Sequence, residues 1–149
     1  MQNNRLIALS ATVLVALATA AFALGAPNQT GGNLVARLNT MQELPQPKAT
    51  RGRGRFIGNI GNGTLRWRLT FSGLTGPAAA AHIHLALAGA ANPAPAVPLC
   101  GPCRNGQTGS VKVSAAVARR IIRGGSYVNI RTPRNKAGEI RGQIASSIG

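Results

Sequence analysis

Short runs of alternating apolar and polar residues follow one another along most of this chain. The clearest run covers residues 64–71, where four apolar side chains occupy every second position: Leu65, Trp67, Leu69 and Phe71. A period of two residues is typical of a β-strand with one buried face and one solvated face. Weaker or shorter runs predict further extended segments at residues 33–39, 54–60, 80–87, 96–99, 109–113, 127–131 and 139–145.

The segments between these runs carry turn residues and one helical pattern. Asn62-Gly63 separates the runs at 56–60 and 64–71 and suits a type I′ turn, so these two runs are predicted to form a hairpin. Ser114 reads as a helix N-cap, and the arginines and glycines that end the next segment are typical of a helix C-terminus. One short helix is therefore expected near residues 115–123. Loops are expected around Pro45 and Pro47 and at residues 72–77 and 88–96.

Many short strands with frequent turn signals and a single helix indicate an all-β domain. We expect an antiparallel, Ig-like β-sandwich or barrel of about seven or eight short strands. The length of 149 residues allows one such domain, which we place at residues 33–149.

The N-terminal segment is predicted to be a targeting sequence. Arg5 precedes a largely apolar run from Leu6 to Leu24, and Ala21-Phe22-Ala23 has the small-x-small form of a signal peptidase site. We assign residues 1–25 to a signal peptide and 26–32 to a flexible leader. The alternative is an uncleaved membrane anchor. No second hydrophobic run follows, so we expect a mature chain without a membrane span, secreted or held in the periplasm or cell envelope.

The charge of the chain is strongly one-sided. Seventeen lysines and arginines face only two acids, Glu43 and Glu139, which gives a formal net charge of +15. One explanation is a compositional bias toward Arg, Ala, Gly and Pro; the other is attraction to polyanions. A candidate polyanion-binding stripe runs along the predicted hairpin: Arg51, Arg53, Arg55, Arg66 and Arg68.

The expected partner is an extracellular protein or an anionic envelope polymer, and the oligomeric state is left open. Nucleic acid is not expected, because export separates the chain from it and few aromatic side chains are present to stack on bases.

The two cysteines form a Cys100-Gly-Pro-Cys103 motif. In an exported chain this spacing favours a small structural disulfide. The same four letters occur in thioredoxin-like redox sites, where the first thiol begins a helix. Here the segment Arg104 to Gly109 is rich in turn residues, and no βαβ pattern surrounds the motif.

Four stretches together resemble the CHRD domain, a repeat unit known from chordin and from exported bacterial proteins. They are Gln42-Glu43-Leu44-Pro45, Ala81-His82-Ile83-His84-Leu85, residues 125–133 and residues 138–144. The resemblance implies an extracytoplasmic all-β module. It also directs attention to seven motif residues: Glu43, His82, His84, Tyr127, Asn129, Glu139 and Arg141.

The histidines and glutamates are the candidates for chemistry. His82 and His84 are two apart on a strand and so share a face, where two imidazoles and a carboxylate are a possible metal set. In the CHRD family the position of Arg131 is often a histidine, and a cation there repels a metal ion. We therefore expect structural roles, with Glu43 and Glu139 anchoring a polar network with His82, His84 or Arg141.

The sequence favours a non-catalytic binding or structural module without a cofactor. No serine elbow motif and no aspartate is present to support nucleophilic catalysis. The alternative is a metal-binding or redox enzyme that uses His82 and His84 or Cys100 and Cys103.

Overall fold

The computed structural model describes residues 32–48 and 50–147. In this part of the chain nine strands and one helix form: β1 (Asn33–Asn39), β2 (Arg53–Gly61), β3 (Thr64–Ser72), β4 (Ala80–His84), β5 (Pro95–Cys100), β6 (Gln107–Lys112), α1 (Ala115–Ile122), β7 (Tyr127–Arg131), β8 (Ile140–Gln143) and β9 (Ala145–Ser146).

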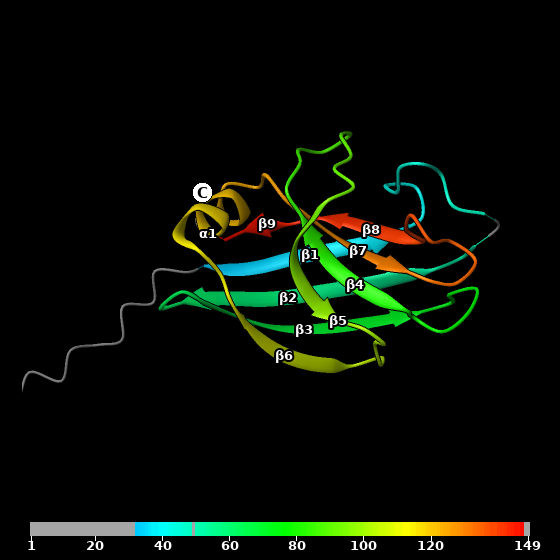
Figure 1. Ribbon diagram of the computed structural model, residues 1–149, viewed down its shortest axis with the longest axis horizontal. Coiled ribbons are helices and arrows are strands. Elements are labelled where there is room, and N and C mark those ends of the chain that lie inside the picture. Colours follow the sequence, from blue (N-terminus) through cyan, green and yellow to red (C-terminus); the bar gives the residue numbers. More distant parts are fainter. Residues whose placement is uncertain (1–31, 49, 148–149) are drawn as a thin grey trace, which may run out of the picture.

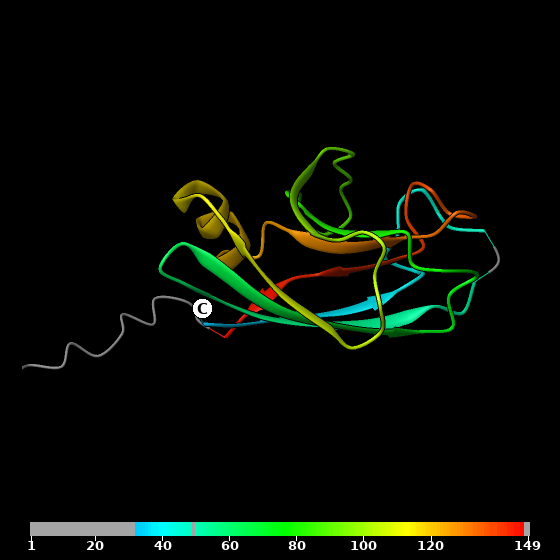
Figure 2. The same ribbon diagram turned by 60° about the horizontal axis from the view of Figure 1, so that its bottom comes forward.

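All the strands belong to one antiparallel sheet that curls into a nearly closed barrel (Figures 1 and 2). The order is β5-β4-β7-β8-β1-β2-β3-β6, and the short β9 also pairs with β1. The two edge strands, β5 and β6, are consecutive in the chain and lie next to each other at the seam. The prediction of an antiparallel sandwich or barrel is thus confirmed, and the barrel-like arrangement is the one adopted.

The core is built from alternate residues of the strands, as the two-residue period predicts. Phe56 on β2, Leu65 and Leu69 on β3 and Ile83 on β4 are fully buried inside the barrel. The helix α1 lies at one end of the sheet near β9 and buries Ile121 (Figure 1). This packing leaves the other side chains of each strand on the outside of the barrel.

The local predictions for the hairpin and the helix are confirmed. Asn62 and Gly63 have φ values of 51° and 68°, the two positive angles that a type I′ turn requires, and β2 and β3 pair on either side of them. The Ser114 side chain accepts a hydrogen bond from the Val117 amide at 3.2 Å and so caps α1.

Two predicted strand boundaries are wrong. The strand expected at 80–87 ends at His84, because the Asn92 side chain donates to the Leu85 carbonyl and draws residues 85–94 into a loop. The strand expected at 139–145 is divided into β8 and β9. Between them the Ile144 amide donates to the Ser126 carbonyl, and β9 pairs with β1.

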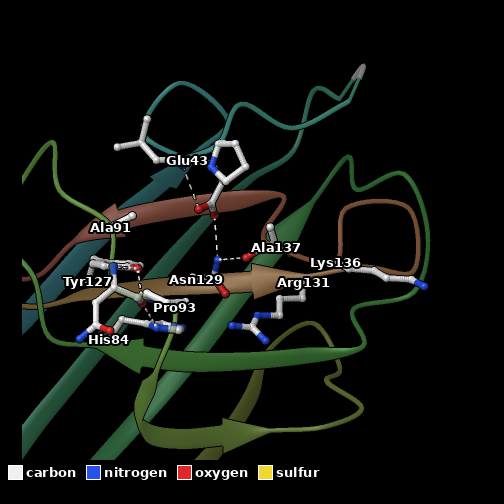
Figure 3. Close-up of a pocket in the computed structure, with 12 residues that line it drawn as sticks. Glu43, His84, Ala91, Pro93, Tyr127, Asn129, Arg131, Lys136 and Ala137 are labelled. Carbon is white, nitrogen blue, oxygen red and sulfur yellow. Dashed lines mark hydrogen bonds between the residues drawn. The ribbon is translucent and has the colours of Figure 1, made fainter.

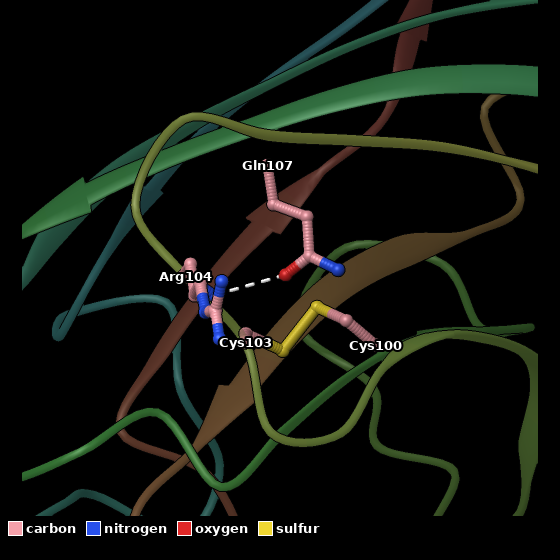
Figure 4. Close-up of a disulfide and its surroundings, with 4 residues drawn as sticks. All are labelled: Cys100, Cys103, Arg104 and Gln107. Carbon is pink, nitrogen blue, oxygen red and sulfur yellow. Dashed lines mark hydrogen bonds between the residues drawn. A yellow bond between two sulfur atoms is a disulfide. The ribbon is translucent and has the colours of Figure 1, made fainter.

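The cysteines form the predicted disulfide. Cys100 ends β5 and is bonded to Cys103 in the connection to β6, with their Cα atoms 5.2 Å apart (Figure 4). Next to it the Arg104 amide donates to Gln107 Oε1. The bridge therefore constrains the turn that joins the two edge strands.

The predicted signal peptide and most of the predicted leader lie outside the described residues. Within residues 32–48 and 50–147, no helix is long and apolar enough to cross a membrane.

Candidate functional site

The outer surface of β1, β2, β3 and β6 gathers cationic side chains. The registers place Arg55 directly opposite Arg37 of β1, and the outward positions of β3 and β6 lie beside it across the sheet. The members of this surface, called the arginine face below, are Arg37, Arg53, Arg55, Arg66, Arg68 and Lys112. Both glutamates of the chain are buried elsewhere, so the arginine face contains no acid.

Four of the five arginines in the predicted polyanion-binding stripe therefore lie on one surface. Arg53, Arg55, Arg66 and Arg68 share the outward face of the hairpin, whereas Arg51 lies in the segment that precedes β2. Sequence reasoning missed Arg37 and Lys112. Arg37 lies between Ala36 and Leu38 in an alternating run, which indicates an outward position. Its position beside Arg55 could not be inferred, because the two residues are far apart in the sequence and meet only through the pairing of β1 with β2.

A shallow groove of about 500 Å³ crosses the arginine face. Its apolar lining includes Val35, Ile57 and Trp67, and three arginines line it: Arg55, Arg66 and Arg68. The face therefore offers guanidinium groups above a partly apolar floor.

A second polar cluster lies at one end of the barrel, around Glu139. This side chain is completely buried and accepts five hydrogen bonds from three different segments. Thr50 Oγ1 and the Thr75 amide donate to Oε1 at 2.6 and 2.7 Å. The Thr75 and Thr132 hydroxyls and the Asn135 amide group donate to Oε2 at 2.6, 2.6 and 3.1 Å.

The environment of Glu139 favours its charged form. Burial raises the pKa of this carboxyl, but the hydrogen bonds from Thr132, Thr50, Thr75 and Asn135 outweigh burial and lower the pKa from 4.5 to about 2. Glu139 is therefore an ionised anchor for the loops that precede β2, β4 and β8.

The outward face of β4, β7 and β8 carries most of the motif residues. His84 lies opposite Tyr127 in the register of β4 and β7, and their rings stack with centroids 5.0 Å apart and planes inclined by 6°. Arg141 on β8, at the other side of β7, places its Cζ atom 3.5 Å from the centre of the Tyr127 ring. A cation over an aromatic face is a favourable contact, so the tyrosine links the two neighbouring strands.

The loop of residues 85–94 covers this stack. Asn92 holds the loop, because its carbonyl contacts His84 Nδ1 at 2.7 Å and accepts from the Tyr127 hydroxyl at 3.1 Å. Arg141 donates to the Leu87 carbonyl at 3.3 Å.

Glu43 approaches the same face from the loop after β1. Its Oε2 accepts from Asn129 Nδ2 at 2.9 Å, and Asn129 also donates to the Ala137 carbonyl (Figure 3). Burial raises the pKa of Glu43 above 4.5, and the hydrogen bonds from the Leu44 amide and Asn129 only partly oppose this shift. A β-carbon at Gly138 would overlap the Asn129 amide and the Glu43 carboxyl, so this approach needs glycine there.

A cavity of about 370 Å³ lies between these loops and the face of β7 (Figure 3). Its polar lining comes from seven side chains: Glu43, His84, Asn92, Tyr127, Asn129, Arg131 and Lys136. Its apolar lining comes from small or cyclic side chains in three loops and from one leucine: Leu44, Pro45, Ala91, Pro93 and Ala137. We call it the β7 cavity.

The expected hydrogen-bond partners of the two glutamates were wrong. Within the described residues, no hydrogen bond to Glu43 or Glu139 comes from a histidine or an arginine; threonines and asparagines take that role. The three threonines were missed because they belong to separate loops, and nothing in a single sequence brings such loops together.

The histidines share a face as predicted, with ring centroids 5.9 Å apart and planes nearly perpendicular. Burial lowers the pKa of both imidazoles, and the nearby Arg131 lowers them further, so both are neutral at neutral pH. Among the described residues no group of three His, Cys, Asp or Glu side chains is placed to hold a metal ion.

A curled antiparallel sheet, a disulfide in the connection between its edge strands and glutamates buried under its loops define a small β-barrel domain. The family model of the CHRD domain matches residues 34–144, so the chain belongs to the CHRD domain family. No curated protein and no solved structure matches the chain significantly.

Proposed function

We propose that this CHRD-domain protein is an exported, non-catalytic module that binds anionic polymers of the cell envelope through its arginine face. The observation that carries the proposal is the gathering of six cations, with no acid among them, on the outer side of four neighbouring strands. Such a surface raises the local concentration of a polyanion and binds it by displacing its counterions.

The spacing of the cations suits a polymer with regularly repeated charges. Alternate residues of a strand are about 6.5–7 Å apart, and neighbouring strands are about 5 Å apart. Arg53 and Arg55 on β2 therefore form one row, and Arg66 and Arg68 on β3 form the next. A guanidinium presents a planar fork that matches carboxylate, sulfate and phosphate groups, so several groups of one chain can be held at once.

A nucleic acid is a poorer match to this surface. Single strands are held by bases stacked on exposed aromatic rings. Trp67, the only tryptophan, points into the barrel and is 6% exposed. The face supplies charge and apolar contact but no stacking platform.

The inferred absence of catalysis rests on the state of the reactive side chains. All the strong donors around Glu139 hold it as a fixed, ionised anchor, and the cysteines are joined to each other. The inferred export rests on the signal-like residues 1–25 and on the disulfide, which persists in oxidising compartments.

Binding to immobilised heparin, with uncharged dextran as the reference surface, tests the proposal. The double variant Arg55→Gln/Arg68→Gln removes two central cations of the arginine face. The double variant Arg119→Gln/Arg123→Gln removes the same charge from exposed positions on and after α1.

We expect the wild type to bind heparin and not dextran. The variant in the arginine face should bind at least about ten-fold more weakly than the helix variant, because charge-assisted contacts contribute about 1.5–3 kcal/mol each. Equal losses in the two variants would show that only net charge matters and would overturn the assignment to this face.

A further inference from the structure

Unpartnered polar atoms are concentrated on one face of the barrel. Among the described residues seven buried side-chain atoms have no hydrogen-bond partner, and six of these belong to β4, β7 and β8: His82 Nδ1, His84 Nε2, Asn129 Oδ1, Arg131 Nε, Arg141 Nη1 and Gln143 Oε1. Folded proteins pair nearly all their buried polar atoms with protein or with ordered water and ligands. The clustering of the exceptions points to this face as a place where another molecule binds.

Arg131 is the most unusual member of the group. It is half-buried, and its buried Nε atom has no hydrogen-bond partner. Figure 3 shows this guanidinium on the side of Arg131 that faces Asn129 and His84. A buried guanidinium N–H without an acceptor is costly, and an anionic group that accepts its hydrogen bond offsets that cost.

The β7 cavity around Arg131 has the composition of a ligand site. Its floor carries His84 and Asn129, both at least nine-tenths buried and each with an unpartnered atom. The exposed Lys136 adds a second positive charge, and the Glu43 carboxyl, which accepts from Asn129 Nδ2, also lines the cavity. Few convergent polar groups within a largely apolar lining are typical of small-molecule sites.

We propose that the β7 cavity binds a small organic carboxylate, about the size of a sugar acid, with Arg131 as the anchor for the carboxylate. The guanidinium fork accepts a carboxylate in bidentate fashion, while Asn129 and His84 provide hydrogen bonds for hydroxyl groups. This site lies on β4, β7 and β8, apart from the strands β1, β2, β3 and β6 of the arginine face, so the inference does not depend on the proposed function.

The size and lining of the cavity distinguish this ligand class from a bare oxyanion. A volume of about 370 Å³ exceeds what one phosphate or sulfate ion fills, and the loops contribute proline, alanine and leucine side chains that suit a carbon skeleton. A metal ion is disfavoured by the positive charge of Arg131 close to both imidazoles.

Nuclear magnetic resonance of the imidazole C–H groups provides the test, because the chain has only two histidines: His84 lines the cavity, and the ring of His82 lies 5.9 Å from that of His84. D-glucuronate, D-glucose and inorganic phosphate are titrated into the full mature protein. The indole signal of Trp67, in the barrel wall that carries the arginine face, serves as the internal reference.

We expect glucuronate to shift the histidine signals in a saturable way and to leave Trp67 unchanged, while glucose and phosphate bind at least about ten-fold more weakly. Arg131→Gln should weaken glucuronate binding by at least about ten-fold. Lys136→Gln should weaken glucuronate binding by a smaller factor. Because Lys136 is exposed, this variant should fold normally, so the test remains valid if Arg131→Gln fails to fold.

Three results would overturn the proposal. They are no histidine shift with glucuronate, a shift that neither Arg131→Gln nor Lys136→Gln weakens, and phosphate binding as tight as glucuronate binding. The control variant Arg55→Gln/Arg68→Gln should bind glucuronate normally, so that loss of heparin binding and loss of carboxylate binding are separate outcomes.

Discussion

The two glutamates show how far one residue type can be shifted by its surroundings. Glu139 is buried among hydroxyl and amide donors and is held ionised, whereas Glu43 is buried with fewer donors and takes up a proton more readily. The sequence indicated that two acids among seventeen bases had structural roles. It did not reveal their partners, because Thr50, Thr75 and Thr132 are distant in the chain from one another.

Replacement of each glutamate by its amide should separate these two roles. Glu139→Gln puts an amide group among hydrogen-bond donors, so we expect a loss of about 3 kcal/mol in the free energy of unfolding. Glu43→Gln imitates the protonated acid and should cost at most about 1 kcal/mol. Urea unfolding at neutral pH measures both, and equal losses would contradict the difference in ionisation inferred from the structure.

The pH dependence of stability should carry the signature of Glu139. The folded-state pKa of about 2 lies below the ordinary value of 4.5, so the unfolded chain binds the proton more readily. The stabilisation is therefore complete above about pH 4.5 and is lost as the pH falls toward 2, by about 3 kcal/mol in total. In Glu139→Gln this decline should be absent, and identical acid profiles for the two proteins would refute the assignment.

The close approach of Glu43 to Asn129 makes Gly138 sensitive to substitution. A methyl group there would overlap both side chains, so we expect Gly138→Ala to lower stability by about 1–3 kcal/mol. Gly76→Ala is the matched control, because its β-carbon would meet only Pro133 Cδ at 3.9 Å. The two variants are compared by thermal unfolding, and a loss in Gly138→Ala no larger than in the control would show that the site can relax.

At the scale of elements, the structures formed by residues close together in the sequence were predicted correctly. The alternating run at 64–71, the Asn62-Gly63 turn and the Ser114 cap each act over a few residues, and each was predictable. The prediction failed at the end of β4, where Asn92 intervenes from eight residues beyond His84. Long-range side-chain contacts of this kind set strand ends and leave no periodic signal.

The type I′ turn gives a test at this scale. Gly63 has a φ of 68°, and a β-carbon there would meet nothing closer than the Val113 carbonyl at 3.7 Å. Gly63→Ala should therefore cost about 1–2 kcal/mol through backbone conformation alone. Gly61→Ala, at the end of β2 without a positive φ, should cost less. Unfolding curves that rank the two variants in the opposite order would argue against the turn type.

At the scale of the whole molecule, the barrel distributes its polar residues over distinct outer surfaces. The arginine face lies on β1, β2, β3 and β6, and most of the motif residues lie on β4, β7 and β8 under three loops. The net charge and the stripe of arginines along the hairpin could be predicted from the sequence. The juxtaposition of Arg37 with Arg55 and the cavity around Arg131 could not be predicted, because both depend on the order of the strands in the sheet.

The salt dependence of heparin affinity tests the central claim most directly. If the arginine face binds a polyanion by releasing counterions, the logarithm of the affinity should fall linearly with the logarithm of the NaCl concentration, with a slope of roughly −3 to −5. Each arginine of the face replaced by glutamine should reduce the steepness by about one, as in phosphate contacts to nucleic acids. An affinity that does not change with salt, or a slope that is the same in Arg55→Gln/Arg68→Gln and the wild type, would contradict the claim.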